Sequence, residues 1–225
     1  MSDKNPKAAI YEYTALVGKS LSSPNRLELL DLLCQGEKSV EILAEQAGLN
    51  VKITSAHLKV LKTARLVESR RDGRFIHYCA TDPAVTSFWV NFRNLAESRF
   101  LEIQQIAKQF ISSAGQMCPY NRKTLLKRAK DGDVVVIDVR PKEEYSAGHL
   151  PYARSIPLAE LKKRLSTLNS KKEIVAYCRG PYCVLSHEAV ELLQMKGFRA
   201  SRITDGVSDW GAAGLPVEKT KGVSR

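Results

Sequence analysis

A cysteine that follows a short apolar run is well placed for nucleophilic chemistry. Residues 173–177 read Glu-Ile-Val-Ala-Tyr, which is typical of a short buried strand, and apolar residues recur at helical spacing from 184 to 195. Cys178 is therefore expected on a loop between the end of a strand and the N-terminus of a helix. Backbone N–H groups and the helix dipole at such a place favour an anion and lower the pKa of a thiol. The pattern thus predicts a reactive thiolate, and a buried structural cysteine is the alternative.

The residues after Cys178 fit a loop that surrounds a bound anion. Gly180 lets the backbone approach a bound group closely, and Arg179 adds a positive charge. Cys183 has two interpretations: a thiol that resolves a modified Cys178 as a disulfide, or a small apolar residue where the helix begins. The predicted substrate-binding loop comprises Arg179, Gly180, Pro181, Tyr182, Cys183 and Val184.

Three further motifs surround this loop in the C-terminal half. They are Val-Val-Val-Ile-Asp-Val-Arg at 134–140, Gly-His-Leu-Pro at 148–151 and Gly-Leu-Pro-Val at 214–217. Together with the cysteine loop they resemble the rhodanese family, over residues 131–218. The resemblance implies an α/β domain with a parallel sheet flanked by helices, and a sulfurtransferase without a cofactor, in which Cys178 carries sulfur from thiosulfate or a persulfide.

The same resemblance assigns two structural residues at the rim of the site. Asp138 and Arg140 are expected to organise the domain through an ion pair with Glu143 or Glu144. His149 and His187 are expected to be structural and exposed, respectively, since a persulfide needs no histidine base.

The cysteine loop departs from common single-domain rhodaneses, in which the small alanine of the following helix comes about two residues sooner than Ala189 does here. A longer loop accommodates a larger oxyanion in the related phosphatases and arsenate reductases. The longer loop makes an arsenate or phosphate-ester enzyme one alternative to the sulfurtransferase. A non-catalytic sensor of reactive sulfur or an oxyanion is another.

The N-terminal half has the pattern of a mainly α-helical DNA-binding domain. Helices are predicted over 40–47 and 51–64, joined by a Gly-Leu-Asn turn, and strands over 66–70 and 74–79, joined at Asp72-Gly73. This is the order of a winged helix-turn-helix. Flanking helices are predicted over 7–21, 26–34 and 84–112, the first with its apolar residues facing inward: Ile10, Tyr13, Leu16 and Val17.

The run Ser-Ala-His-Leu-Lys-Val-Leu-Lys at 55–62, with Leu66-Val67 and Gly73-Arg74 after it, resembles the ArsR-type transcriptional repressors over residues 8–110. The resemblance implies a homodimer, formed by the first and last helices, that binds a palindromic operator in double-stranded DNA. Seven basic residues against two acidic ones between 52 and 74 agree with a polyanionic partner. The predicted DNA contacts are Lys52, Thr54, Ser55, His57, Lys59, Arg70, Arg71 and Arg74, with a core-facing structural histidine as the alternative for His57.

Metal sensing of the kind known in ArsR-type proteins is not expected. The helix at 40–47 lacks the family's Cys-x-Cys pair, and residues 84–112 contain no cysteine or histidine. Soft divalent metals need several such ligands. Cys34, Cys79 and Cys118 are expected to be small buried residues or thiols without a sensing role.

The length and composition agree with two globular domains. The 225 residues, 44% of them hydrophobic, allow two domains, which we predict at 1–114 (winged helix-turn-helix) and 115–225 (rhodanese-like). Five cysteines without a paired framework suit a reducing cytoplasm, and no apolar run is long enough to span a membrane. The net charge of +11 favours a polyanionic partner.

Overall fold

The computed structural model describes residues 5–110 and 117–220. The chain divides into two compact units, residues 1–89 and 90–225. The predicted domain boundary at 114/115 and the linker at 112–116 lie outside the described residues.

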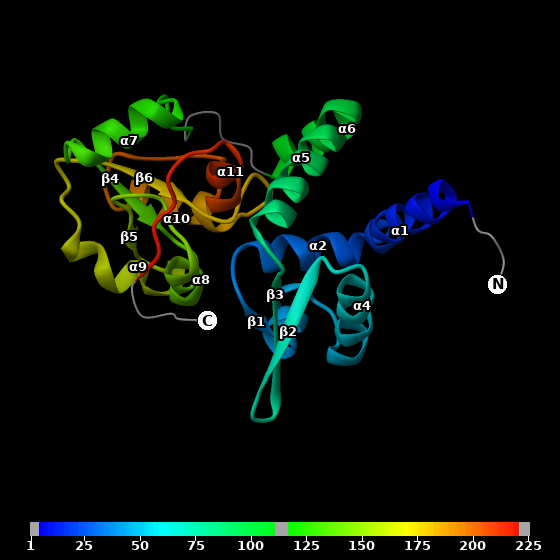
Figure 1. Ribbon diagram of the computed structural model, residues 1–225. Helices are drawn as coiled ribbons and strands as arrows, with labels where there is room; N and C mark the ends of the chain where they lie inside the picture. The colour runs from blue at the N-terminus through cyan, green and yellow to red at the C-terminus, as the bar shows by residue number, and fades with distance from the viewer. Residues whose placement is uncertain (1–4, 111–116, 221–225) are drawn as a thin grey trace. The chain divides into compact units, whose positions relative to one another are not determined.

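The N-terminal part is a winged helix-turn-helix (Figure 1). Its three-stranded antiparallel sheet has the strand order β1-β3-β2, and Gly73, with a φ of 57°, closes the hairpin between β2 and β3. The elements are α1 (Pro6–Leu21), α2 (Pro24–Cys34), β1 (Lys38–Ser39), α3 (Val40–Gln46), α4 (Val51–Thr63), β2 (Val67–Asp72), β3 (Phe75–Ala80), α5 (Pro83–Arg99) and α6 (Leu101–Phe110).

Side-chain caps fix the helix-turn-helix. The Ser39 hydroxyl accepts a hydrogen bond from the N–H of Ile42 at 3.3 Å, and the Asn50 side chain accepts one from the N–H of Ile53 at 2.9 Å. The apolar face of α4 then packs on α2, where Leu29, Leu58 and Leu61 are fully buried. This core holds α4 at a defined orientation on the domain surface.

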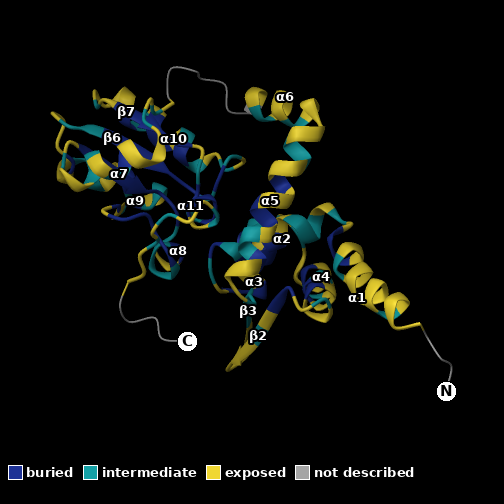
Figure 2. Ribbon diagram, turned by 45° about the horizontal axis from the view of Figure 1, so that its top comes forward, coloured by how far each residue is buried: buried dark blue, intermediate teal, exposed yellow. Residues whose placement is uncertain are grey.

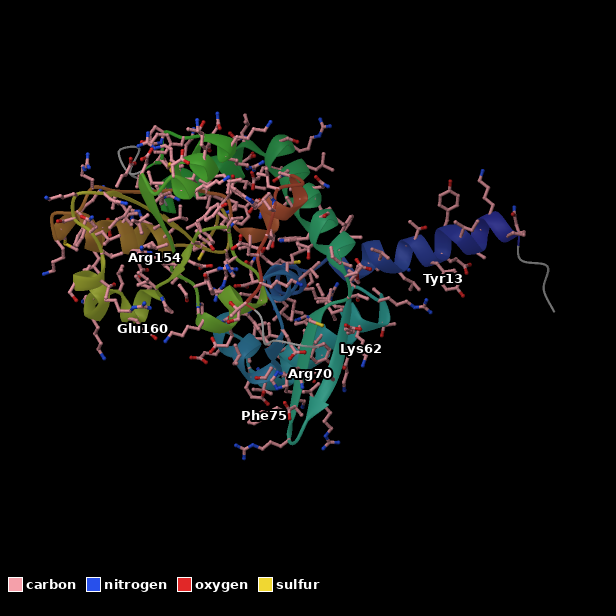
Figure 3. The ribbon with its side chains drawn as sticks, turned by 60° about the vertical axis from the view of Figure 1, so that its left-hand side comes forward. Tyr13, Lys62, Arg70, Phe75, Arg154 and Glu160 are labelled. Atoms are coloured by element: carbon pink, nitrogen blue, oxygen red, sulfur yellow. The ribbon has the colours of Figure 1, made fainter. Side chains whose placement is uncertain are left out.

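Two predictions for the flanking helices were wrong. Ile10, Tyr13 and Leu16 do not face inward: they are 64%, 74% and 45% exposed, because only the C-terminal end of α1 packs on α2. Most of α1 is accordingly coloured as exposed in Figure 2, and the Tyr13 side chain projects from the helix in Figure 3. The single helix predicted over 84–112 is two helices, α5 and α6, which meet at Phe100 with no proline or glycine at the break.

The C-terminal part is an α/β fold whose four-stranded sheet has the strand order β5-β4-β6-β7, with every neighbouring pair parallel. Its elements are α7 (Arg122–Lys130), β4 (Val134–Asp138), α8 (Lys142–Ala147), β5 (Arg154–Ser155), α9 (Leu158–Arg164), the 3₁₀ turn η2 (Leu165–Thr167), β6 (Glu173–Tyr177), α10 (Leu185–Met195), β7 (Ala200–Arg202) and α11 (Val207–Ala212). This confirms the predicted fold class.

Helices cover both faces of this sheet. Leu161 of α9 and Ala189 of α10 pack with Ile137 on one face, whereas Leu125 of α7 and Trp210 of α11 pack on the other. The two central strands, β4 and β6, are buried on both sides, so they read as nearly continuous apolar runs rather than alternating ones. The carboxyl ends of β4, β6 and β7 meet at one edge of the sheet, where loops can converge on a ligand.

Candidate active site and nucleic-acid interface

Cys178 lies directly after β6 at the carboxyl edge of the parallel sheet, as predicted. Its side chain is 2% exposed and packs in the core between the sheet and α10. The loop turns back immediately, since the N–H of Cys183 donates to the carbonyl of Gly180 at 3.2 Å. Gly180 has a φ of 154°, a conformation that L side chains rarely adopt. The sequence of this turn therefore holds the thiol at the entrance to α10.

Hydrogen bonds at the first turn of α10 favour the thiolate form of Cys178. The Ser186 hydroxyl lies 3.3 Å from the Cys178 Sγ, within reach to donate to a thiolate. The protonated thiol donates instead to the Cys183 carbonyl oxygen at 3.3 Å. Burial raises the pKa of Cys178, but hydrogen bonds from the Cys183 thiol, from the hydroxyl and N–H of Ser186 and from the backbone of Gly180 outweigh it and lower this pKa to about 6. The hydrogen bond to Cys178, together with burial, raises the pKa of Cys183 far above its usual range. These opposite shifts make the Cys178 thiol the more readily ionised of the two.

Two ion pairs hold the loop and its rim. Arg179 makes a bidentate contact with Glu144 of α8, with nitrogen–oxygen distances of 2.7 to 3.1 Å. The Arg179 side chain therefore ties the loop to α8 rather than extending into solvent. Asp138 and Arg140, predicted at the rim, are both fully buried and pair with each other at 2.6 Å. Arg140 also donates to the carbonyl of Gly148 at 2.7 Å, which fixes the turn after α8.

The turn between β7 and α11 packs against the cysteine loop. A Cβ added at Gly206 would lie 2.0 Å from the carbonyl oxygen of Arg179, so only glycine fits. The Asp209 carboxylate accepts the N–H of Gly206 at 2.8 Å. The remaining loop residues face outward: Tyr182 and Val184 are exposed, whereas Pro181 is half-buried.

The start of α4 offers polar side chains for contact with DNA, with one exception. Lys52 and Lys59 are exposed and Ser55 is half-buried. Thr54, predicted as a DNA contact, is fully buried, and its hydroxyl donates to the carbonyl of Asn50 at 3.0 Å, so that prediction was wrong. His57 is half-buried, with its Nε2 3.4 Å from the side-chain amide of Asn25.

The wing places three arginines along the β2–β3 hairpin, where Arg70 and Phe75 are labelled in Figure 3. Arg70 is 54% exposed and pairs with Glu37 at 2.5 Å and with Asp72 at 3.2 Å. Arg71 donates to the carbonyl of Gly73 at 3.1 Å, and the Arg74 guanidinium lies 4.9 Å from the ring centre of Phe75. The charge of Arg70 is thus partly offset by carboxylates before any DNA binds.

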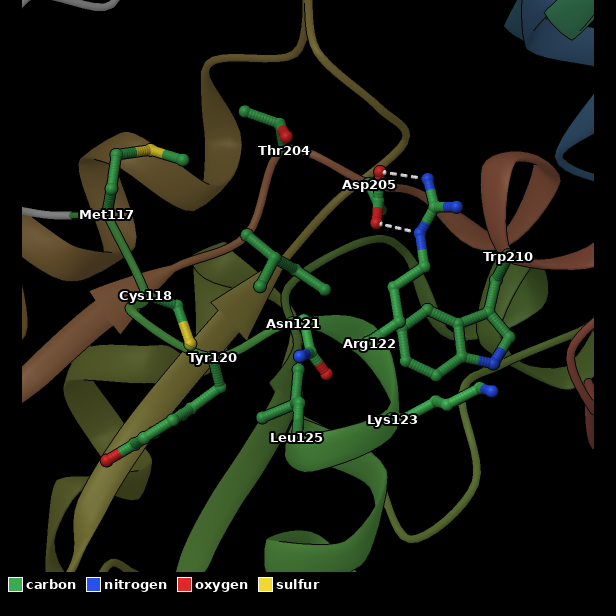
Figure 4. A pocket seen from close by; sticks show the side chains of 11 residues that line it. Met117, Cys118, Tyr120, Asn121, Arg122, Lys123, Leu125, Thr204, Asp205 and Trp210 are labelled. Atoms are coloured by element: carbon green, nitrogen blue, oxygen red, sulfur yellow. Dashed lines mark hydrogen bonds and ion pairs between the residues drawn. The ribbon is translucent and has the colours of Figure 1, made fainter. Parts of the chain in front are cut away.

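A hollow of about 510 Å³ lies beside α7 (Figure 4). Its lining includes Cys118, Trp210 and the ion pair between Arg122 and Asp205, and none of the residues of the Cys178 loop. Burial raises the pKa of Cys118, so its thiol is a weaker nucleophile at neutral pH than that of Cys178. Within residues 5–110 and 117–220, no cluster of histidine, cysteine and carboxylate side chains could hold a metal ion.

Comparison with known proteins identifies both halves. The model for bacterial regulatory proteins of the arsR family matches residues 23–69, and that for the rhodanese-like domain matches residues 121–213. HTH-type transcriptional regulator Rv0324 of Mycobacterium tuberculosis is 40% identical over 213 residues, which is 95% of this chain and 93% of that protein. The chain belongs to the ArsR-type transcriptional regulators that carry a rhodanese-like domain.

Two other proteins similar to this regulator carry names from sulfur chemistry. The putative sulfur carrier protein YrkF of Bacillus subtilis is 25% identical over 175 residues, covering 72% of this chain and 94% of that protein. A sulfurtransferase of Allochromatium vinosum is 29% identical over 91 residues, covering 40% of the regulator and 83% of that protein. Across the described part of the regulator, no helix is long and apolar enough to cross a membrane.

Sequence reasoning missed two residues of this site. Ser186, 1% exposed, supplies the hydroxyl at the Cys178 thiol, and Glu144, 2% exposed, is the partner of Arg179. A serine in the first turn of the helix after a reactive cysteine is a sequence pattern that could have identified Ser186. The pairing of Glu144 with Arg179 joins residues 35 positions apart and could not be read from local sequence.

Proposed function

We propose that this regulator accepts sulfane sulfur on Cys178 and that the sulfur-loaded form binds its operator with altered affinity. The observation that carries the proposal is the buried Cys178 thiol, whose pKa is lowered to about 6 by hydrogen bonds at the entrance to α10. A thiolate there can attack a sulfur donor, and the same donors can hold the persulfide anion that forms. The sulfur carrier and sulfurtransferase relatives support this choice over phosphate-ester or arsenate chemistry.

The transfer is a displacement at sulfur. The Cys178 thiolate attacks the outer sulfur of thiosulfate, the sulfur–sulfur bond of the donor breaks, and sulfite leaves with the electron pair. The product is a Cys178 persulfide anion, whose outer sulfur a thiol or cyanide then removes, which regenerates the thiolate. Charge is conserved in each step, and neither needs an external oxidant or reductant.

Cys183 gives the persulfide a second fate. Attack of the Cys183 sulfur on Cys178 Sγ would form a Cys178–Cys183 disulfide and release hydrosulfide. The hydrogen bond between the two thiols supports this role, whereas the raised pKa of Cys183 makes the attack slow. Replacing Cys183 by alanine should then preserve loading and prolong the life of the persulfide.

On the DNA side, we propose a cytoplasmic homodimer that places its two α4 helices in successive major grooves of a palindromic operator. Lys52, Ser55 and Lys59 would contact the groove, and the wing arginines would contact phosphates. Exposed apolar residues on α1 and α6, among them Ile10 and Ile106, support a dimer that covers them.

One experiment tests both sulfur uptake by Cys178 and its effect on operator binding. The full chain is treated with thiosulfate, its mass is measured, and its affinity for operator DNA is compared before and after loading, with Cys178→Ser as control. We expect a gain of one sulfur atom and a change in affinity, both absent in the control. A regulator that takes up sulfur and changes affinity, but passes no sulfur to cyanide, is a sensor without turnover. One that takes up no sulfur contradicts the proposal.

A further inference from the structure

Arg202 ends β7 on the same face and at the same edge of the sheet as Cys178. It pairs with Ala176 in the parallel register between β6 and β7, and Ala176 stands two residues before Cys178. Side chains two apart in a strand share a face. Ala200, Ala176 and Cys178 all pack in the core under α10, so Arg202 is directed to that face at the carboxyl edge.

The Arg202 side chain is buried there without an acidic partner. It is 3% exposed, and its Nε has no hydrogen-bond partner. No carboxylate forms an ion pair with it among the residues that the structure describes. Burial lowers the pKa of Arg202, and the charge of Cys178 opposes this, which places the guanidinium within electrostatic reach of the thiolate. An arginine nevertheless stays protonated in proteins, and a buried cation without a partner is costly unless an anion binds it.

The other three arginines of this region cannot supply that charge as freely. Arg93, beside Gly180, pairs with Asp209 and with Glu97. Arg179 is held by both carboxylate oxygens of Glu144, and Arg140 by Asp138. Their charges are offset within the fold. The Arg202 charge is offset by no carboxylate in the described part of the chain and is therefore available to a ligand.

We infer that Arg202 is the oxyanion-binding residue of the Cys178 site, where it binds the sulfonate end of thiosulfate and selects oxyanionic sulfur donors over neutral ones. The inference rests on the proposed sulfur transfer. In the displacement given above, sulfite leaves with an electron pair and two negative charges. A guanidinium at the leaving group stabilises that charge as it develops, and its planar donors suit sulfonate oxygens.

Binding without turnover is the first test. Thiosulfate is titrated calorimetrically into full-length Cys178→Ser, alone and combined with Arg202→Gln, Arg202→Lys or Arg199→Gln. Arg199 is exposed three residues earlier, so its variant removes the same charge from the surface. We expect Arg202→Gln to weaken binding at least about tenfold, the loss typical of a charged hydrogen bond, Arg202→Lys to weaken it less, and Arg199→Gln to leave it unchanged. Absence of binding to Cys178→Ser, or equal binding to all variants, overturns the inference.

A matched pair of reagents separates charge selection from general damage to the site. Cys178 is alkylated with iodoacetate, which is anionic, and with iodoacetamide, which is neutral, in the wild-type chain and in Arg202→Gln. We expect the rate ratio of iodoacetate to iodoacetamide to fall in the variant and to be partly restored in Arg202→Lys. Equal slowing with both reagents would mean that Arg202 only supports the thiolate, which overturns the inference. A wild-type chain that binds thiosulfate through Arg202 but gains no sulfur contradicts the proposed function and leaves the inference standing.

Discussion

Positive charge is buried around Cys178 and exposed along α4 and the wing. Arg140 and Arg202 are 0% and 3% exposed, whereas the Arg70 side chain is 54% exposed. Around the cysteine each cation is held by packing. Arg93, Arg140 and Arg179 each pair with a carboxylate, whereas Arg202 pairs with none among the described residues. Along the hairpin, long side chains reach into solvent from a thin two-stranded support.

The difference follows from what each region binds. A reaction at one sulfur atom needs a nucleophile and its hydrogen-bond donors fixed before the donor arrives. A DNA backbone presents a row of phosphates, and affinity for it is a sum of many similar contacts. We therefore expect single substitutions near Cys178 to have larger effects than single substitutions on the wing.

The largest effect is expected from Cys178 itself. Cys178→Ser should abolish the gain of one sulfur atom from thiosulfate, because a hydroxyl in the same place is not ionised near neutral pH. Intact-mass measurement checks this, with Cys118→Ser as the matched control, which should load normally. Loading that moves to another thiol in the Cys178→Ser chain would contradict the assignment.

Gly206→Ala should come next. Its new methyl group would overlap the carbonyl oxygen of Arg179, and such overpacking costs about 1–3 kcal/mol of unfolding free energy. Urea denaturation measures the loss, and sulfur loading should fall with it because the cysteine loop must shift. Gly211→Ala is the control: its Cβ would meet only a Val217 methyl, at 3.9 Å, and the change should be neutral or stabilising by up to about 1 kcal/mol. Equal stability of the two variants would mean that the turn at Gly206 does not support the cysteine loop.

Ionisation of Cys178 gives a smaller, pH-dependent effect. The pKa of its thiol is lowered to about 6, so the alkylation rate with iodoacetamide should stay high at pH 7 and fall as the pH drops through about 6, where the thiolate is protonated. Ser186→Ala removes one of the hydrogen bonds that lower this pKa and should move the midpoint upward. A wild-type midpoint near 8.5, the value of a free cysteine, would contradict the proposed stabilisation.

The wing should show the smallest effects per residue. Arg71→Gln and Arg74→Gln should each reduce the slope of log affinity for operator DNA against log salt concentration by about one. Arg70→Gln should reduce it less, because Glu37 and Asp72 already offset part of that charge. Fluorescence anisotropy at several salt concentrations measures the slopes, with the exposed Lys130→Gln as control. A larger effect at Arg70 than at Arg74 would mean that Arg70 leaves its carboxylates when DNA binds.

Local patterns predicted the elements of both halves well. The strand at 173–177 and the turn at Gly73 depend on neighbouring residues, and each has the expected structure. Thr54 shows the limit of this reasoning. It lies on the same helix as the exposed Lys52, but each residue turns the helix by about 100°, so the side chain two positions later points to the buried face. The exposure of Ile10 and Tyr13 could not be predicted either, because an apolar face indicates burial without indicating whether the same chain supplies the cover.

The residues of the candidate site likewise fall into two groups, those that the local sequence predicts and those that it does not. Cys178 and its loop lie in one stretch of sequence between a strand and a helix, so both were predicted. Glu144 and Arg202 come from α8 and β7, and only the order of strands in the sheet brings them to the cysteine. An arginine in a short strand reads as an edge residue on the surface, and nothing local indicates that α10 and the neighbouring strand bury it.

The two sheets also differ in how much of the chain must be synthesised before their strands can pair. The hairpin of β2 and β3 joins residues within 67–80, and β1 adds to it from residues 38–39. The parallel sheet instead joins β4, at 134–138, to β6, at 173–177, and then to β7, at 200–202. During synthesis from the N-terminus, the winged sheet can therefore pair while most of the chain is still unmade, whereas the cysteine loop gains its support only after residue 206 has emerged. A ribosome that stops between these points would release a chain with α4 and the β2–β3 hairpin in place but without a finished cysteine site.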